Sequence, residues 1–385
     1  MRLGFRAGGI SGMIGDQEWE EGLAARSQQA REAWRAAVKR VIRRTLVFLG
    51  VFGVVAALAS PAPYIIEMPG PTFNALATMD GRDIITIEGA KTYAGEGNFD
   101  VLTVQTRGGP ESLPSWIEVF WAQLSSENEV VEYSKIYPAG VTKEEQQAET
   151  TQMMLDSQRD AVAVALRNQG YKVDSVVAID SIKKDGPSFS KLKVDDQILS
   201  VNGVEVKWYE DITNVIADSG GNAVDIKVLR GKQEKTVSIK PVLDTDGKYR
   251  VGIFVGYRYE FPINVKIDLG DVTGPSGGLM FSLSIIDLLS PGALNGGKYV
   301  AGTGTIAPDG SVGPIGGIRL KMIAAKKAGA EYFIGPMTNC DEMVGNVPAG
   351  MKARAVETIE DALDFLSDIR DGTPISPTLN CPATK

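Results

Sequence analysis

One uncharged segment near the N-terminus restricts the architecture of this chain more than any other feature. Residues 45–66 (TLVFLGVFGVVAALASPAPYII) carry no charge, and a helix of about 22 residues is long enough to cross a hydrocarbon core of about 30 Å. Because cytoplasmic flanks carry an excess of Lys and Arg, the basic residues on its N-terminal side predict that residues 1–44 are cytoplasmic and that the chain after about residue 66 lies outside. These basic residues are Arg31, Arg35, Lys39, Arg40, Arg43 and Arg44, and the next one after the segment is Arg82.

Two other interpretations of this segment stay open beside the anchor. It resembles the apolar region of a cleaved signal peptide, since Ala57-Leu58-Ala59 is similar to a small-residue cleavage site, although 44 preceding residues are long for such a peptide. It could also be a buried core helix, which the basic flank and the prolines at 61 and 63 disfavour. The sequence therefore favours a membrane anchor.

Composition excludes several kinds of chemistry. The chain has 385 residues, 43% of them apolar, which is enough for two or three globular domains. A net charge of -8 argues against nucleic-acid binding, which needs clustered Lys and Arg. The absence of histidine removes Ser-His-Asp and Cys-His catalysis and His-ligated zinc, so any hydrolysis must use other bases.

The only two cysteines are Cys340 and Cys381, which are too few for a four-thiolate zinc site, and we expect no metal. If this part of the chain is exported, they are expected to form one disulfide. In a reducing compartment they would be two separate thiols.

The predicted secondary structure after the anchor changes near residue 170, from a mixed α/β pattern to short strands around one short helix. Thr142 followed by Glu145 is a capping-box pattern for a long helix to about residue 169. Residues 67–170 are therefore predicted as a mixed α/β region, to which no chemistry can be attached. Predicted strands in the chain are 83–87, 99–105, 175–179, 197–201, 224–229 and 235–239, with a short helix at 209–217.

Residues 191–206 (KLKVDDQILSVNGVEV) resemble the second half of a PDZ domain, with Asn202-Gly203 as a hairpin turn. We therefore expect a PDZ-like domain over residues 171–245. The resemblance implies that this domain binds the C-terminal segment of a partner as an added strand. A small β-domain that only spaces the anchor from the rest of the chain is the alternative.

The first reactive side chain lies in the turn GPSGG at 274–278, which leads into an apolar helix. Ser276 is expected at or near the N-cap, where free N–H groups and the positive end of the helix dipole favour an oxyanion. Ordinary N-capping by Ser276 is the alternative.

The second is Lys321, in a helix that opens after Gly316-Gly317. By the 3.6-residue period Lys321 shares the apolar face of Ile318, Met322 and Ala325. Burial there would lower its pKa and free the amine to act as a base. The alternative is a lysine that extends out of the core to solvent.

Together these two segments resemble the proteolytic domain of Lon-type serine proteases, over about residues 250–368. In that family the serine of Gly-Pro-Ser-(Ala/Gly)-Gly is the nucleophile, and a lysine shortly after Pro-Ile-Gly-Gly is the base. Here GPSGG at 274–278 and PIGG at 314–317, followed by Lys321, match both motifs. The resemblance implies Ser276 and Lys321 as catalytic residues and Thr303 as a threonine that supports the lysine.

The predicted fold is α/β and multidomain. Its parts are a cytoplasmic tail (1–44), a transmembrane helix (45–66), a mixed α/β region (67–170), a PDZ-like domain (171–245), a Lon-type domain (246–368) and a C-terminal tail (369–385). The whole pattern resembles bacterial membrane-anchored proteases that join a PDZ domain to a Lon-type domain.

That resemblance implies a serine endopeptidase that cleaves polypeptides outside the cytoplasm. No cofactor is expected: residues 292–298 come close to a phosphate loop but continue with Tyr299, so activity should be independent of ATP. The expected partners are polypeptide substrates, the membrane and a C-terminal peptide on the PDZ domain, and a homo-oligomer stays open. The alternatives are a non-catalytic membrane-tethered PDZ adaptor with an inactive Lon-like domain, and an amidase or other acyl hydrolase that uses the same residue pair.

Overall fold

The computed structural model describes residues 15–79, 81–93, 95–137, 143–244, 246–270, 272–376 and 380–381. The chain divides into two compact units. The first comprises Met1–Ala62 and Pro114–Trp121, and the second comprises Pro63–Leu113 and Ala122–Lys385.

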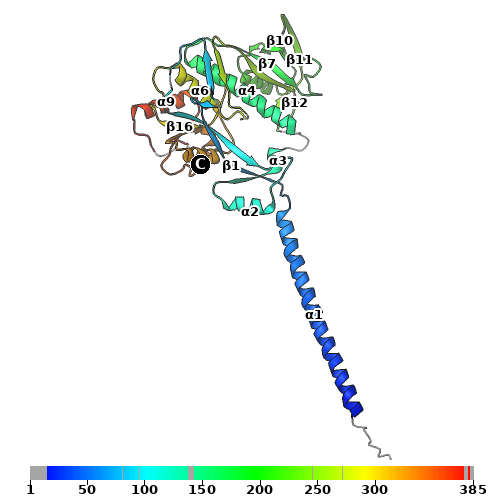
Figure 1. Ribbon diagram of the computed structural model, residues 1–385. Helices are drawn as coiled ribbons and strands as arrows, with labels where there is room; N and C mark the ends of the chain where they lie inside the picture. The colour runs from blue at the N-terminus through cyan, green and yellow to red at the C-terminus, as the bar shows by residue number, and fades with distance from the viewer. Residues whose placement is uncertain are drawn as a thin grey trace, which may run out of the picture. The chain divides into compact units, whose positions relative to one another are not determined.

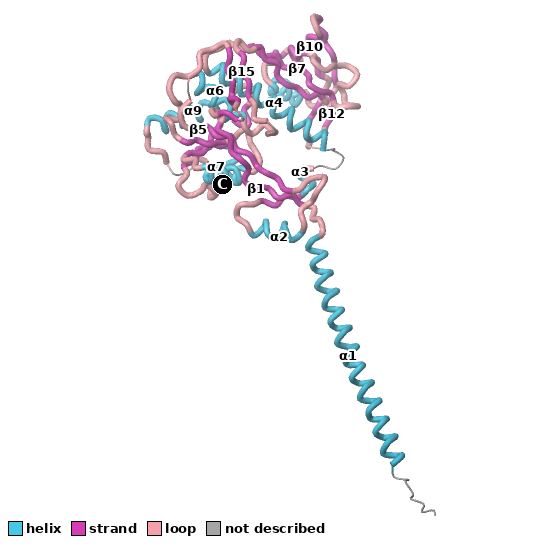
Figure 2. The backbone as a smooth tube through the Cα atoms, in the orientation of Figure 1, coloured by secondary structure: helices cyan, strands magenta, loops and turns pink. Residues whose placement is uncertain are grey.

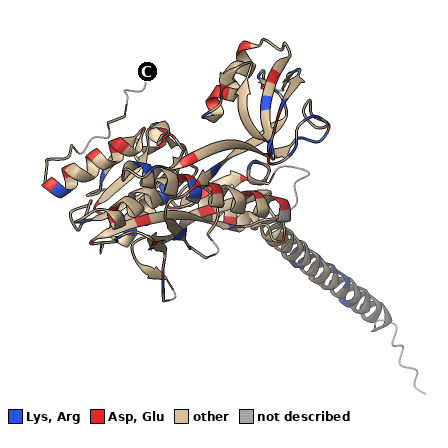
Figure 3. Ribbon diagram, turned by 90° about the horizontal axis from the view of Figure 1, so that it is seen from above, with Lys and Arg blue, Asp and Glu red and all other residues tan. Residues whose placement is uncertain are grey.

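The first unit is dominated by one long helix, α1 (Gly15–Ala59) (Figure 1). Its segment Ala33–Ala59 contains an 18-residue window with a mean hydropathy of 2.0, no part of which is buried, and it is long and apolar enough to cross a membrane. A signal sequence near an N-terminus would have the same properties. Figure 3 shows that the Lys and Arg residues of α1 lie away from its C-terminal end, as the sequence indicates.

The helix α1 ends at Ala59, earlier than the predicted boundary at residue 66. Prolines at 61 and 63 remove backbone donors that a continuing helix would need. The chain then enters a strand, in which Ile65 and Ile66 are buried. The last apolar residues of the predicted anchor therefore belong to the core of the second unit.

A short helix, α2 (Trp116–Leu124), begins beside the end of α1. The N–H of Trp116 donates to the carbonyl of Ser60 at 3.2 Å, and the N–H of Ala62 donates to the carbonyl of Pro114 at 2.8 Å. The Glu118 carboxylate accepts from the N–H of Ser115 at 2.7 Å, which caps the helix.

The centre of the second unit is a six-stranded sheet of order β20-β19-β16-β5-β1-β6. Its strands β1 and β5 are labelled in Figure 2. Its strands β5, β16, β19 and β20 run parallel to one another, and β1 pairs antiparallel with both β5 and β6. Their bounds are β1 (Tyr64–Asn74), β5 (Asn98–Arg107), β6 (Glu129–Glu132), β16 (Tyr299–Gly302), β19 (Tyr332–Pro336) and β20 (Lys352–Val356).

This sheet corrects the predicted separation of residues 67–170 from the Lon-type domain. Strands β1 and β5 come from that region, yet β5 pairs with β16, where Val101 lies opposite Gly302. Strands β1 and β5 of the mixed α/β region are therefore an integral part of the domain that contains Ser276 and Lys321, while residues 114–121 of that region belong to the first unit.

Each face of the sheet carries its own apolar core. Val101 belongs to the core that includes Leu279 and Phe281 of α6 (Gly278–Leu289). The next residue, Leu102, belongs to the core that includes Ile318 of α7 (Ile318–Ala328). Since successive strand residues point to opposite faces, helices α6 and α7 cover opposite faces of the sheet.

The predicted long helix is α4 (Lys143–Asn168), which packs against α6, where the Ser282 hydroxyl donates to the carbonyl of Ala161 at 3.2 Å. Its predicted cap, Thr142, lies outside the described residues. The last helix is α9 (Ile359–Asp371), capped by Thr358 and Asp361. Cys340 and Cys381 form a disulfide across a separation of 41 residues.

The predicted PDZ-like domain is a second sheet with the strand path β11-β10-β8-β7-β14 and the helix α5 (Tyr209–Asp218). The predicted strands of this part and the Asn202-Gly203 turn are confirmed, with φ of 49° and 83° at those two residues. Strand β14 extends the domain past the predicted boundary at residue 245, because it pairs with β7 along its length. The bounds are β7 (Asp174–Ile182), β8 (Gln197–Val201), β9 (Val204–Glu205), β10 (Val224–Arg230), β11 (Gln233–Ile239) and β14 (Ile253–Glu260).

The remaining elements are short. They are β2 (Thr78–Met79), β3 (Arg82–Asp83), β4 (Ile85–Glu88), α3 (Tyr133–Ile136), β12 (Val242–Leu243), β13 (Tyr249–Arg250), β15 (Asn264–Ile267), β17 (Thr305–Ile306), β18 (Val312–Gly313), a single 3-10 turn (Met337–Asn339) and α8 (Cys340–Met343).

Candidate active site

Ser276 lies in the turn that starts α6. The helix begins at Gly278 with Gly277 as N-cap, so Ser276 lies one residue before the observed N-cap and close to its predicted position. Its backbone carbonyl accepts the N–H of Gly304 at 2.9 Å and the hydroxyl of Thr303 at 3.0 Å. These two bonds fix the turn against the residues that follow β16.

The turn also requires a glycine at 278. A Cβ at Gly278 would lie 2.7 Å from the Ser157 hydroxyl of α4 and 2.8 Å from a methyl group of Ile306. Only hydrogen fits between these groups, so the glycine lets α4, α6 and the residues after β16 approach one another at the serine.

Lys321 lies on the inner face of α7, as the periodicity predicted. Ile318, Met322 and Ala325 on the same face are fully buried, and Lys321 itself is 3% exposed. The helix starts after Gly317, whose φ of 67° is a left-handed conformation that glycine adopts without strain. Arg319 points elsewhere and pairs with Glu129 at 2.8 Å.

The structure brings all three predicted residues together at the end of β16. Nζ of Lys321 lies 2.7 Å from Oγ of Ser276 and 3.1 Å from Oγ1 of Thr303. Thr303 is fully buried. A nucleophile, a base within hydrogen-bond reach and a third group that holds both are the arrangement that nucleophilic catalysis requires.

Burial sets the electrostatics of the pair. Desolvation of the ammonium lowers the pKa of Lys321 to about 8, against a smaller opposing effect of the Glu67 carboxylate. The pKa of Glu67 is in turn raised, first by its own burial and then by Glu129. Near neutral pH a usable fraction of Lys321 is therefore the neutral amine.

Ser276 and Lys321 open into one pocket of about 910 Å³. Its walls come from parts of the chain far apart in sequence: Glu67 on β1, residues 101–105 on β5, Thr150 on α4, and residues 314–316 before α7. Sequence analysis assigned no role to Glu67 or β5. The sequence pattern predicted a strand at 99–105, within β5, but did not link it to the site.

Within the described residues, no group of three or more His, Cys, Asp or Glu side chains is placed to hold a metal ion. The reactive groups that the pair presents are a hydroxyl and an amine.

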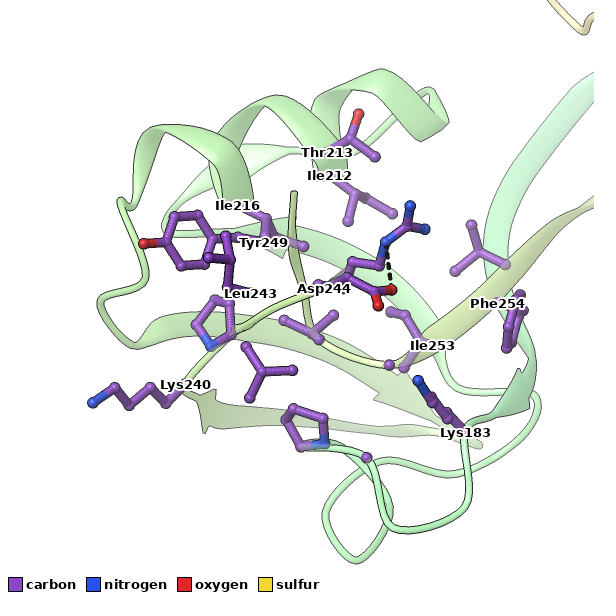
Figure 4. A pocket seen from close by; sticks show the side chains of 18 of the residues that line it. Lys183, Ile212, Thr213, Ile216, Lys240, Leu243, Asp244, Tyr249, Ile253 and Phe254 are labelled. Atoms are coloured by element: carbon purple, nitrogen blue, oxygen red, sulfur yellow. Dashed lines mark ion pairs between the residues drawn. The ribbon is translucent and has the colours of Figure 1, made fainter. Parts of the chain in front are cut away.

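A second pocket, of about 970 Å³, lies in the PDZ domain (Figure 4). Ile212 and Ile216 of α5 line one side, and Ile253 and Phe254 of β14 line another. Asp244 and Arg250, which form an ion pair at 3.0 Å, also line the pocket. The pocket is a groove between a helix and a strand, and its lining mixes apolar and charged side chains.

Comparisons with known proteins identify two families of domain in this chain. Residues 260–367 match the family model of the Lon protease (S16) C-terminal proteolytic domain, and residues 154–240 match the PDZ domain model. The chain thus contains a Lon-type proteolytic domain, which supports a serine peptidase, and a PDZ domain.

Among similar curated proteins, Lon protease of Campylobacter concisus is 31% identical over 157 residues, which are 40% of this chain and 19% of that protein. Lon protease of Azospirillum brasilense is 37% identical over 105 residues, 26% of this chain and 13% of that protein. The chain therefore spans a fifth or less of the length of these relatives. Among solved structures, the PDZ domain of the SdrC-like protein from Listeria monocytogenes is 26% identical, covering 21% of this chain and 86% of that one, with a TM-score of 0.20.

Proposed function

We propose that this chain is a membrane-anchored serine endopeptidase that cleaves polypeptides outside the cytoplasm with a dyad of Ser276 and Lys321. The observation that carries the proposal is the 2.7 Å approach of Nζ of a buried Lys321 to Oγ of Ser276. A buried lysine with no purpose would be costly, because its charge loses hydration.

The reaction starts with Lys321 in its neutral form. Its amine takes the hydroxyl proton of Ser276 while Oγ attacks the carbonyl carbon of the scissile peptide bond. The resulting ammonium returns the proton to the departing amine, which leaves an ester on Ser276. Lys321 then takes a proton from water, the hydroxide attacks the ester, and the released Ser276 oxygen recovers the proton.

The developing oxyanion needs donors, and the turn supplies them. Among the described residues, the backbone N–H groups of Ser276 and Gly277 donate to no other group. Both precede α6, whose N-terminal dipole also favours negative charge. Loss of one such donor elsewhere reduces kcat by about 10²–10³-fold.

The PDZ pocket provides a second site for the polypeptide. Its groove between α5 and β14 suits an extended segment that adds to a strand edge, with Ile212 and Ile216 among the apolar side chains that line it. We assign it substrate or partner binding. Since the dyad needs only water, the proposed reaction is independent of ATP.

The anchor is α1. Its segment Ala33–Ala59 has the length to cross the bilayer, and the basic residues at the N-terminal end of that segment, from Arg35 to Arg44, favour a cytoplasmic N-terminus. N-terminal sequencing of the mature protein tests this directly. A start near Ser60 would identify a cleaved signal peptide, whereas the original N-terminus in carbonate-washed membranes would support the anchor.

The catalytic proposal is tested with the full chain in detergent micelles and casein as an unfolded substrate, without nucleotide. Ser276→Ala and Lys321→Met should each abolish cleavage while circular dichroism stays unchanged. Lys326→Met is the matched control, because Lys326 lies on the same helix and is exposed.

Activity that survives both variants would refute the dyad. No cleavage by the wild-type chain would favour the membrane-tethered PDZ adaptor. Cleavage of small amides without cleavage of casein would instead indicate an amidase that uses the same pair.

A further inference from the structure

Helix α2 carries an apolar face that the described part of the chain leaves uncovered. One side of the helix is buried, with Val119 3% and Ala122 5% exposed. The other side is open to solvent, and its exposed side chains are Trp116 (42%), Ile117 (38%), Phe120 (52%), Trp121 (63%) and Leu124 (64%).

These five residues form one continuous stripe. Their spacing of one, three, one and three positions follows the helical period, so all lie within one side of α2. The single charged residue of the helix, Glu118, is on the buried side and accepts the N–H of Ser115 at 2.7 Å. The open side therefore presents no charge.

The position of α2 places this stripe beside the end of α1. Its first residue, Trp116, donates to the carbonyl of Ser60 at 3.2 Å, and Ser115 forms a β-bridge with Pro61. Bridged residues lie about 5 Å apart. The helix thus begins where the apolar segment of α1 ends, at Ala59.

The chemistry of the stripe fits the boundary of a bilayer. Tryptophan gathers at membrane–water interfaces, where its ring is partly apolar and its N–H stays hydrated. A helix with a continuous apolar face lies in the plane of that boundary with the face embedded in lipid.

We propose that α2 is an interfacial helix, whose stripe of Trp116, Ile117, Phe120, Trp121 and Leu124 inserts into the lipid surface where α1 leaves the membrane. The proposal rests on the proposed anchoring by α1. It adds a second contact with the bilayer that the anchor alone does not imply.

The test uses the full chain in nanodiscs of phosphatidylcholine and phosphatidylglycerol, with an environment-sensitive fluorophore on a single introduced cysteine. Trp121→Cys places the label in the stripe, and Cys340 and Cys381 are already joined in a disulfide. We expect blue-shifted emission that falls at least twofold when the lipids are brominated near the headgroup.

Two controls isolate the stripe. The first control carries the label at Val344→Cys, an apolar position just after α8 that is 51% exposed. Its emission should be that of a fluorophore in water, and brominated lipid should not quench it. A label at Ile117→Cys should lose its blue shift when Phe120→Asp and Trp121→Asp are introduced together.

The outcomes separate this proposal from the anchor. A water-like label on α2 in a chain that stays in nanodiscs would overturn the interfacial helix and leave the anchor intact. A blue shift without quenching by brominated lipid would show that protein, such as a second copy, covers the stripe. A chain that does not enter nanodiscs at all would overturn the anchor and this inference with it.

Discussion

The hydroxyl of Thr303 donates a 3.0 Å hydrogen bond to the backbone carbonyl of Ser276, while its oxygen lies 3.1 Å from Nζ of Lys321. One buried side chain therefore holds the backbone of the proposed nucleophile and the head of the proposed base in a fixed relation. Thr303 lies outside the set of residues that line the pocket, so it acts through the other two.

Thr303→Val should consequently reduce kcat by about fivefold with little change in KM, since one net hydrogen bond is worth about 1 kcal/mol. Thr303→Ser keeps the hydroxyl and should recover most of the rate. Steady-state kinetics on a fluorogenic peptide measures both. A rate of Thr303→Val equal to that of the wild type would remove the positioning role.

The pH dependence of kcat/KM should report Lys321. Its pKa of about 8 means that the active neutral amine increases as pH rises through 8, so kcat/KM should rise with a midpoint near 8 and then level off. The Glu67 carboxylate raises that pKa. Glu67→Gln should therefore move the midpoint to lower pH. A midpoint near 10 in the wild type would contradict the burial argument.

Gly278→Ala should destabilise the proteolytic domain, because its Cβ would lie 2.7 Å from the Ser157 hydroxyl and 3.1 Å from the backbone nitrogen of Ile306. Overpacking of this kind costs roughly 1–3 kcal/mol. The matched control is Gly316→Ala, where no heavy atom lies within 4 Å of the added Cβ. Calorimetric Tm values should fall for Gly278→Ala only. A Tm of Gly278→Ala equal to that of the wild type would show that α4 can move to admit the added methyl group without loss of stability.

Asp287 makes the stability of the domain depend on pH. Among the described residues, its Oδ2 is buried without a hydrogen-bond partner, and burial raises its pKa from 3.8 to about 6. A raised folded-state pKa favours folding below about pH 4, an effect lost as pH rises through 6. Asp287→Asn, which keeps an acceptor for the N–H of Leu294, should raise Tm at pH 7 and have little effect at pH 4.

The disulfide should contribute substantially to stability. The disulfide joins Cys340 and Cys381 across a separation of 41 residues. It should raise the free energy of unfolding by up to about 4 kcal/mol, because it lowers the conformational entropy of the unfolded chain. Urea unfolding with and without reductant should therefore give a lower midpoint in the reduced protein. The double variant Cys340→Ser and Cys381→Ser should match the reduced form and no longer respond to reductant.

The sequence by itself determined the features that depend on neighbouring residues. The helical period placed Lys321 on the buried face of α7, and the Asn202-Gly203 turn specified the hairpin between β8 and β9. Both follow from local geometry. A helix repeats every 3.6 residues, and the two-residue turn of a β-hairpin needs residues that adopt positive φ, such as Asn and Gly.

Only the tertiary structure decided which distant segments meet. A strand pattern at residues 99–105 predicts a strand but does not name its neighbour, and the pairing of Val101 with Gly302 joins segments separated by the whole PDZ domain. The same is true of Glu67, which reaches the pocket of Lys321 only because β1 is the next strand of that sheet. Hydrogen bonds between distant strands and packing on both faces of the sheet determine which strands pair. Neither can be predicted from the residues of one strand alone.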